Sequence, residues 1–280
     1  TTFDIRVDQY EENKHFFLTQ AFGNFYDHTL SDLNHIGTSV NITRLEVWVT
    51  SRSFVSSQNN QNRNIFAFAD LGEYNPDPSQ QYVLVSPTGV QAPSDSSNQL
   101  LTQLDNDIAG GINQLRRISN STLIENAPAI AGKNFTRTKN YETVENARLL
   151  QPSEYTFSSS LGYISLNSKL RSNDVLAVAF EYTINGQAHR VGELTSSSGI
   201  SGDSALFVKL IHSTNFSPKF YIWDLMMKNI YSLGGYSISP DKFRLDVLYQ
   251  DDRIGGNINY IPVGCNTVQG IPLLTLFNLD

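Results

Sequence analysis

Histidines, acidic pairs and glycine doublets occur in this 280-residue chain, but not at the spacings that catalysis or metal binding requires. His15 and His28 fall on one predicted helix without the spacing of a metal-binding pair. No H-E-x-x-H, G-x-S-x-G, P-loop or G-x-G-x-x-G motif is present. The positions of these residue types therefore identify neither a catalytic site nor a metal site.

Two acidic stretches resemble part of a calcium-binding or acid–base site but lack the remaining residues that such a site needs. The stretch "LDNDIAGG" starts like a calcium-binding loop, but Ala109 stands where a third oxygen ligand is needed, and Leu115 or Arg116 where the closing Glu belongs. Asp251 and Asp252 stand in "QDDRIGGN", which is typical of a polar hairpin turn. No two carboxylates are placed by the sequence at the separation that glycoside hydrolysis needs. We expect no cofactor or metal, and the missing motifs count against an enzyme without excluding one.

Composition narrows the class of protein further. With 40% hydrophobic and 17% charged residues the chain should fold, and its net charge of −7 argues against binding nucleic acid or anionic lipid. The single cysteine, Cys265, excludes an intrachain disulfide and a multi-cysteine metal site. The opening "TTFDIRVDQY" has no features of a signal peptide, and polar and glycine residues interrupt the uncharged stretch 261–279. We expect a soluble fragment of a longer polypeptide.

One stretch, "WDLMMKNIYSLGG", joins both methionines of the chain to one of its two tryptophans. A cofactor pocket, a promiscuous groove and a core-packing helix all fit this composition. At helical spacing Trp223, Met226, Met227, Ile230 and Tyr231 share one face, and glycines follow as a C-cap. We therefore interpret the segment as a packing helix near 223–233, in which both methionines fill the core.

The elements that position these residues follow from apolar periodicity. Helical spacing predicts helices over 8–30 and 95–118. Alternation predicts strands over 40–53, 65–74, 176–184, 188–194, 205–213 and 243–250. Asn185 and Gly186 predict a tight hairpin between two of these strands.

Together these elements predict an α+β fold. N-terminal helices would cover a small antiparallel sheet, and a mainly antiparallel, sandwich-like β region with one short packing helix would follow. On this basis the chain divides into an α+β subdomain, residues 1–140, and a mainly β subdomain, residues 141–280.

Several long stretches, in the same order, resemble the SprA/Sov family, the outer-membrane translocon of the Bacteroidetes type IX secretion system, which gliding motility also needs. The stretches are "DQYEENKHFFLTQAFGNFYD", "VNITRLEVWVTSR", "NIFAFADLGEY", "ENARLLQPSEYTFSSSLGYISLN", "LAVAFEYTINGQAHRVGE", "WDLMMKNIYSLGGYSISPDKFRLDVLY" and "PLLTLFNLD". Within them we single out twelve positions, called here the resemblance residues. They are Trp48, Asp70, Glu73, Tyr155, Gly162, Tyr182, Gly186, Trp223, Asp224, Met226, Met227 and Tyr231.

The resemblance implies a soluble, non-catalytic structural and interaction domain of a very large translocon. Its location would be extracytoplasmic and associated with the outer membrane, with the cell surface favoured over the periplasm. Its partners would be other domains of the same chain, together with accessory secretion proteins and exported cargo, and not nucleic acid. The domain itself would not span the membrane.

Two other functions remain open on the sequence. A secreted carbohydrate-binding or glycan-hydrolysing β-rich domain could use Tyr163, Tyr182 and Tyr236 as a sugar platform. A surface adhesin would share the fold and differ only in its partner. A cleft with convergent carboxylates would favour the carbohydrate function, whereas shallow, apolar-edged patches would favour the translocon domain.

Overall fold

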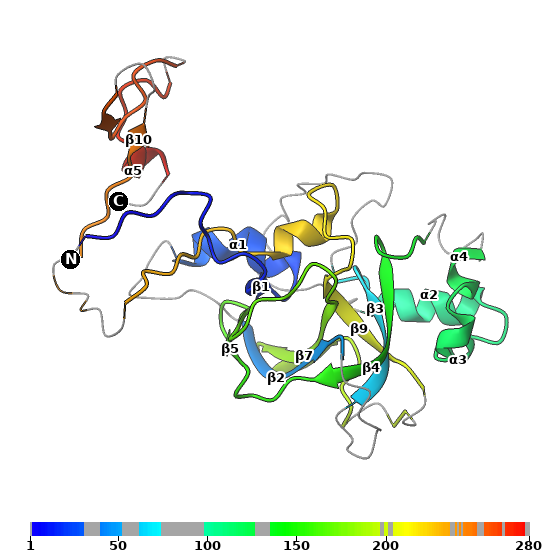
Figure 1. The fold of residues 1–280 in the computed structure, drawn as a ribbon. Helices are drawn as coiled ribbons and strands as arrows, with labels where there is room; N and C mark the ends of the chain where they lie inside the picture. The colour runs from blue at the N-terminus through cyan, green and yellow to red at the C-terminus, as the bar shows by residue number, and fades with distance from the viewer. Residues whose placement is uncertain are drawn as a thin grey trace. The chain divides into compact units, whose positions relative to one another are not determined.

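The computed structural model describes residues 2–30, 40–51, 62–73, 98–126, 135–196, 199–200, 204–235, 239, 241, 243–250, 255–264 and 267–277 (Figure 1). The chain forms two compact units, unit 1 (Thr1–Ser232) and unit 2 (Leu233–Asp280). Of the described residues 33% are in strands and 19% in helices, so the fold is mostly β.

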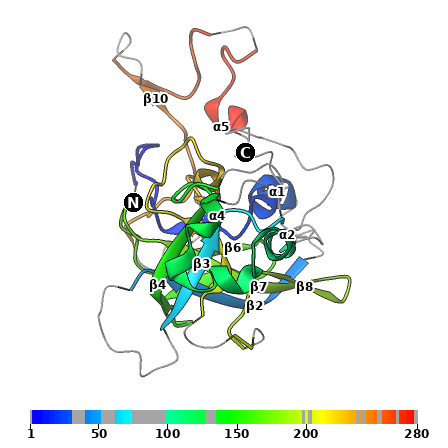
Figure 2. The ribbon, with the colours of Figure 1, turned by 90° about the vertical axis from the view of Figure 1, so that its right-hand side faces the viewer.

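Unit 1 is built around a closed barrel of five strands. The strands are β2 (Val40–Val49), β4 (Tyr141–Leu149), β3 (Asn62–Phe68), β9 (Leu206–His212) and β7 (Leu176–Ile184), in this order around the ring. Closure comes from β7, which pairs back onto β2 along its whole length. Only the β3–β9 pair is parallel within this described ring. A further strand, β8 (Gln187–Val191), extends β7 into a hairpin that projects beyond the ring (Figure 2).

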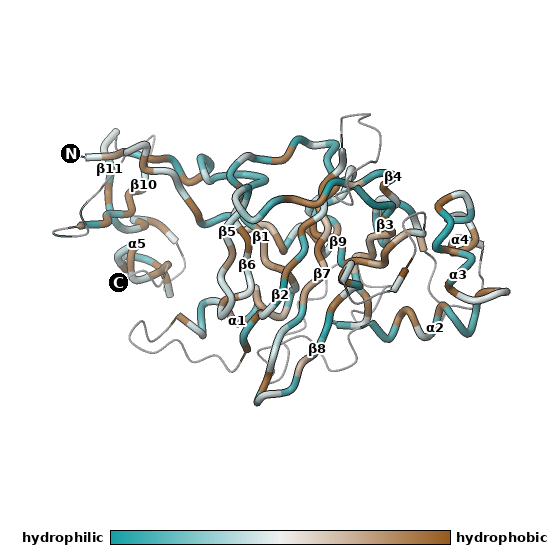
Figure 3. The backbone as a smooth tube through the Cα atoms, turned by 90° about the horizontal axis from the view of Figure 1, so that it is seen from below, coloured by the Kyte–Doolittle hydropathy of each residue, from teal (hydrophilic) through white to brown (hydrophobic). Residues whose placement is uncertain are grey.

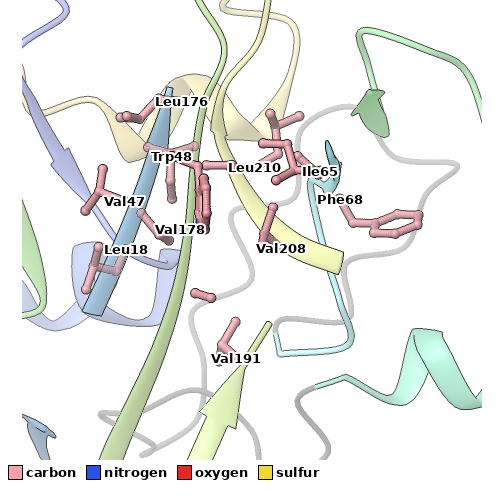
Figure 4. Packing of buried hydrophobic residues seen from close by; sticks show 14 of the residues in the cluster. Leu18, Val47, Trp48, Ile65, Phe68, Leu176, Val178, Val191, Val208 and Leu210 are labelled. Atoms are coloured by element: carbon pink, nitrogen blue, oxygen red, sulfur yellow. The ribbon is translucent and has the colours of Figure 1, made fainter. Parts of the chain in front are cut away.

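Long apolar runs in β7 and β9 explain why both faces of these strands are largely buried. All seven residues of β9 are buried, and hydrophobic residues run along both strands in Figure 3. Trp48 and Leu210 are both paired with Ala177 and therefore share one face of the barrel wall, whereas Val47 and Val178 share the other face with Leu18 beside them (Figure 4). Each fully buried side chain of this size contributes about 1.5–3 kcal/mol relative to an exposed one. The barrel interior is therefore a packed core.

A second, three-stranded sheet adjoins the barrel core. Its strands, in order, are β1 (His15–Phe17), β6 (Tyr163–Leu166) and β5 (Tyr155–Ser158), and helix α1 (Gln20–Leu30) follows β1. From α1, Phe22 packs on Phe180 of the barrel with ring centroids 6.3 Å apart. Gly162 has φ +65°, and a Cβ there would lie 2.2 Å from the Phe22 ring, so only glycine fits this turn.

Short helices complete unit 1. They are α2 (Gln99–Asp107), α3 (Ile112–Leu115), η1 (Ile118–Asn120) and α4 (Leu123–Asn126), with η2 (Tyr221–Leu225) later in the chain. Leu100, Leu104 and Leu115 are buried and join the same core as the barrel. Figure 1 shows α2 to α4 as a group beside β3 and β4.

Unit 2 has little regular structure. It contains the strand pair β10 (Tyr249–Gln250) and β11 (Asn257–Ile258), and helix α5 (Leu273–Leu276). Leu273 is its only buried hydrophobic residue among those that the structure describes.

The predicted α+β class is wrong: the fold is a closed β-barrel with few helices, and no N-terminal helices cover a sheet in the described part of the chain. The predicted helix 8–30 is divided, because His15–Phe17 pair with Tyr163–Ser165 as a strand and only Gln20–Leu30 is helical. A distant ladder partner here outweighs the local helical spacing. The sandwich-like second half is also wrong, since β2 and β3 close the ring with β7 and β9.

Two further predictions differ from the structure. The division between compact units falls after Ser232 instead of at residue 140, and the barrel takes strands from both sides of residue 140. The predicted helix 223–233 is a 3-10 turn, Tyr221–Leu225, followed by non-helical chain. The reason is that β1 captures this backbone: Met226 bridges Phe16, and Met227 N–H donates to His15 O at 2.9 Å.

Two predictions of local structure are confirmed. Asn185 and Gly186 form the β7–β8 hairpin turn, with φ +50° and +80°. The region 95–118 is helical over Gln99–Asp107 and Ile112–Leu115, and its first three residues lie outside the described part. None of the helices in the described ranges has the length and apolar content that crossing a membrane requires.

Candidate functional site: a buried ionic cluster

The most unusual electrostatic feature of the protein is an ion pair inside unit 1. Lys209 Nζ lies 2.5 Å from Glu73 Oε1, and neither side chain is exposed at all. The lysine stands in the apolar strand β9, where the parallel register places it beside Phe68 at the end of β3. Its ammonium group also donates to the carbonyl of Ala69. The pair therefore joins β9 to the chain that leaves β3.

The loop after β3 is shaped by its own carboxylates. Gly72 N–H donates to Asp70 Oδ1 at 2.8 Å, and Leu71 N–H donates to Glu73 Oε2 at 2.7 Å. Each carboxylate thus satisfies a backbone donor that would otherwise lack a partner. The loop holds Glu73 in position for Lys209.

Burial dominates the protonation of this cluster. It raises the pKa of Glu73 to about 7; the nearby Lys209 ammonium opposes the rise, and the Asp70 carboxylate adds to it. Burial, together with Asp70 and Glu73, also raises the pKa of Tyr221 well above its ordinary value. Glu73 therefore gains or loses its proton near neutral pH, and the Tyr221 hydroxyl stays protonated.

A buried lysine beside a carboxylate can serve acid–base or imine chemistry, but only where a substrate can reach it. Lys209 and Glu73 are sealed within the core. A cavity that described residues line lies along β4, and no member of this cluster lines it. The geometry therefore supports a fastening role at the only parallel junction of the described ring.

Three of the other resemblance residues are buried, and two occupy turns. Trp48 and Tyr182 are fully buried in the barrel, and Tyr155 is buried in the small sheet. Gly162 and Gly186 occupy turns with positive φ. None of these five residues lines the cavity along β4.

The chain around the two methionines is bound to the N-terminal segment. Met226 and Met227 are 1% and 2% exposed, and Met226 Sδ accepts a hydrogen bond from Asn13 N–H at 3.3 Å. Tyr231 donates from its hydroxyl to Val7 O at 3.0 Å. The prediction that both methionines fill the core is confirmed, although the chain there is not helical.

The two remaining resemblance residues, Trp223 and Asp224, lie nearer the surface. Trp223 is half-buried, and its ring lies 4.9 Å from that of Phe216, centroid to centroid. The Lys228 ammonium lies 5.6 Å from the Trp223 ring centroid, within cation–π range. Asp224 is exposed. Trp223 thus covers the edge of the core and does not line the cavity along β4.

Of the three tyrosines in the predicted sugar platform, Tyr163 and Tyr182 lie in the part of the chain that the structure describes. Tyr182 is fully buried, and its ring stacks on His189 at 5.4 Å. Tyr163 is half-buried and packs edge-on against Tyr26. Tyr236 lies outside the described residues, as do Cys265, Asp251 and Asp252.

A second polar arrangement, which spacing along the sequence could not reveal, links β1 and β6. Ser165 Oγ lies 2.8 Å from His15 Nδ1, and His15 Nε2 lies 2.9 Å from Glu11 Oε2. A serine, a histidine and a carboxylate in this order resemble a hydrolase triad. However, Ser165 is on the central strand of its sheet, paired with His15 on one side and Thr156 on the other. Because two ladders use the backbone donors there, the serine has no adjacent pair of free N–H groups to stabilise an oxyanion.

Among the described residues no group of three or more His, Cys, Asp or Glu side chains could hold a metal ion. Comparison with protein-family models found no matching family, and comparison with curated proteins found no matching protein.

Proposed function

We propose that this chain is a non-catalytic structural and interaction domain, in which unit 1 is the scaffold and unit 2 carries the docking surface. One observation carries the proposal: unit 2 buries one hydrophobic side chain among its described residues and exposes seven large ones. The exposed residues are Phe243, Leu245, Leu248, Tyr249, Tyr260, Val263 and Phe277.

Exposing so many large apolar side chains leaves a region of this size with little buried area to stabilise its fold. A stretch of fewer than 50 residues rarely supplies a stable core without a metal, disulfides or association with a partner. Large exposed apolar side chains concentrated in one region mark interaction sites more often than scattered single ones do. Unit 2 is therefore expected to gain much of its order from the surface that it contacts.

The segment Phe243–Leu248, just before β10, shows what kind of surface would fit. Phe243 and Leu245 alternate with Arg244 and Asp246, whose side chains form an ion pair at 2.9 Å. This period of two is the pattern of a strand with one apolar and one charged face. Its partner would be an open sheet edge with apolar side chains on one face, since added strands gain affinity from the backbone and specificity from alternate side chains.

The resemblance to the SprA/Sov translocons supports a specific setting for this function. In that setting the partner surface belongs to another domain of the same very long chain, with accessory secretion proteins and cargo as further contacts. The proposed location is extracytoplasmic, at the outer membrane and on the cell-surface side, in type IX secretion and gliding motility.

Photo-crosslinking in cells that make the protein tests this proposal. Benzoylphenylalanine at Phe243 should give one dominant product, which mass spectrometry assigns to a translocon chain. The same group at Leu123, an exposed apolar residue of unit 1, is the matched control and should give none. Equal crosslinking from both positions, or products with unrelated abundant proteins alone, would refute the docking role of unit 2.

A further inference from the structure

Strand β4 of the barrel pairs more extensively with one of its two neighbouring strands than with the other. On one side β4 pairs with β3 from Asn62↔Arg148 to Phe68↔Tyr141. On the other side it meets β2 at only two positions, Trp48↔Leu149 and Val49↔Arg148. The stretch 141–147 therefore has a second edge without a neighbouring strand among the described residues, and we call this edge the seam.

Hydrogen-bond parity shows which backbone groups face the seam. Ala69 N–H donates to Asn140 O at 2.9 Å, so that pair is a hydrogen-bonded one, and such pairs alternate in an antiparallel ladder. Glu142 then bonds to β3, whereas the N–H and C=O of Thr143 point to the seam. Consistent with this, Tyr141 O, two residues earlier, accepts from Thr138 N–H at 2.8 Å on that side.

The backbone N–H and C=O of Thr143, which face the seam, have few hydrogen-bond partners. Its carbonyl accepts a long bond of 3.5 Å from Arg137 Nη2, and the Arg137 side chain is 56% exposed. Its N–H has no hydrogen-bond partner within the described ranges. An exposed arginine side chain therefore contacts the Thr143 carbonyl where a neighbouring strand would otherwise bind.

A cavity of about 460 Å³ coincides with the seam. Its lining includes Thr143 and Glu145 of β4, and Thr50, Asn173, Val175 and Thr214 from the facing segments. This volume lies within the usual range of ligand sites. No aromatic side chain of the described residues lines it, so a sugar would find no ring to stack on.

The charges of the cavity favour one kind of ligand. Glu142 is satisfied internally: it accepts from Thr214 N–H at 3.1 Å and Thr214 Oγ1 at 2.6 Å, and Arg137 lies 3.7 Å away. Glu145 is exposed and has no ion-pair partner among the described residues. The carboxylate that remains for a ligand is therefore that of Glu145, which attracts a cation.

We propose that the seam binds an extended peptide carrying a lysine or arginine, which adds to β4 as a short strand. The peptide backbone exchanges hydrogen bonds with Thr143 in place of Arg137, and the basic side chain pairs with Glu145. This site lies wholly in unit 1 and does not depend on the docking role of unit 2.

Fluorescence anisotropy with the 280-residue chain tests the site. The probe is a fluorescein-labelled, end-capped peptide Lys-Val-Thr-Val-Lys-Val, and the comparison peptide has Glu in place of both Lys residues. We expect saturable binding of the Lys peptide, at least fivefold tighter than that of the Glu peptide. No saturable binding below 1 mM, or equal binding of both peptides, would overturn the proposal.

Three variants locate the binding. Thr143→Pro removes the seam-facing N–H but no bond to β3, so it should weaken binding at least tenfold while the circular dichroism spectrum is retained. If that variant does not fold, Asn173→Trp fills the cavity from an exposed turn and should have the same effect on binding. Glu145→Gln should reduce the preference for Lys over Glu to within twofold. Glu12→Gln, an exposed carboxylate in the N-terminal segment, is the matched control and should change nothing.

Retention of wild-type affinity in the Thr143→Pro and Asn173→Trp variants would show that the peptide binds elsewhere. An undiminished Lys preference in Glu145→Gln would equally refute the assignment.

Discussion

The two units of this chain bury their apolar residues in opposite proportions. Every buried hydrophobic residue of the described chain except Leu273 belongs to unit 1. Unit 2 exposes side chains as large as Phe243 and Phe277, at 63% and 59%. In unit 1 the strands pair with one another in a ring, apart from the seam along β4, whereas the chain before β10 has an alternating pattern and no strand beside it in the described residues. The contrast separates a self-sufficient scaffold from a region that needs a partner.

The largest effect should come from the two methionines that fix the N-terminal segment to the core. Met226→Ala with Met227→Ala should lower the free energy of unfolding of unit 1 by roughly 4–8 kcal/mol, because each leaves a cavity among buried side chains. Urea denaturation followed by circular dichroism measures this. A near-neutral result would mean that this face is open, and the contrast between the units would disappear.

Breaking the buried ion pair should cost nearly as much. Lys209→Met leaves the Glu73 carboxylate buried without its partner, which should destabilise unit 1 by about 3–5 kcal/mol. Adding Glu73→Leu should recover most of the loss. Arg190→Met removes an exposed partner of Glu181 and, as the control, should cost less than about 1 kcal/mol. Equal effects of the two single variants would contradict the burial of Lys209.

Gly162 and Gly186 both occupy turns with positive φ, but only Gly162 is packed against a neighbouring side chain. Gly162→Ala should cost about 3 kcal/mol, because it adds a clash with the Phe22 ring to the strain of positive φ. Gly186→Ala has the strain but no atom within 4 Å of the new Cβ, so about 1 kcal/mol is expected. Thermal unfolding of both variants gives the comparison. Similar costs would place the tip of the β7–β8 hairpin inside the packing.

The buried carboxyl group should make unit 1 sensitive to pH. Since the pKa of Glu73 is raised to about 7, the folded chain holds this proton more tightly than the unfolded chain does. The contribution of Glu73 to stability is then fully present below its ordinary pKa near 4.5 and is lost as the pH rises through 7. Between pH 5 and 8 the wild type should lose roughly 1–3 kcal/mol more stability than Glu73→Gln. Parallel profiles of the two proteins in urea titrations would refute the shift.

The smallest effect on stability is expected in unit 2. Phe243→Ser with Val263→Ser should change the stability of unit 1 by less than about 0.5 kcal/mol, because both side chains are exposed. The same change should lower the fluorescence of bis-ANS bound to the free chain. A large loss of stability would show that these side chains support the scaffold.

Structural features that depend on residues adjacent in the sequence could be predicted. The β7–β8 hairpin follows from Asn185 and Gly186 because a two-residue turn needs positive φ at both positions. The burial of Met226 and Met227 follows from their place among aromatic and apolar residues. The shape of that segment does not, because it depends on a bridge to Phe16 that helical spacing cannot reveal.

Closure of the ring and the buried ion pair could not be predicted, because both depend on contacts between residues far apart in the sequence. Local alternation identifies β2 and β7 as strands but does not show that Val47 pairs with Val178. Lys209 was visible as the one charge in an otherwise apolar run. Nothing local tells that its counterion is Glu73, so Asp70 and Glu73 were selected by resemblance alone.

The parallel pairing of β3 with β9 has a consequence for synthesis of the chain. Ile65 cannot meet Leu206 until the ribosome has made the intervening residues, which takes on the order of 10 s at typical rates of elongation. During that interval the apolar strand β3 lacks one of its two neighbours and is open to aggregation. We therefore expect a holding chaperone to protect the nascent chain most until β9 is complete.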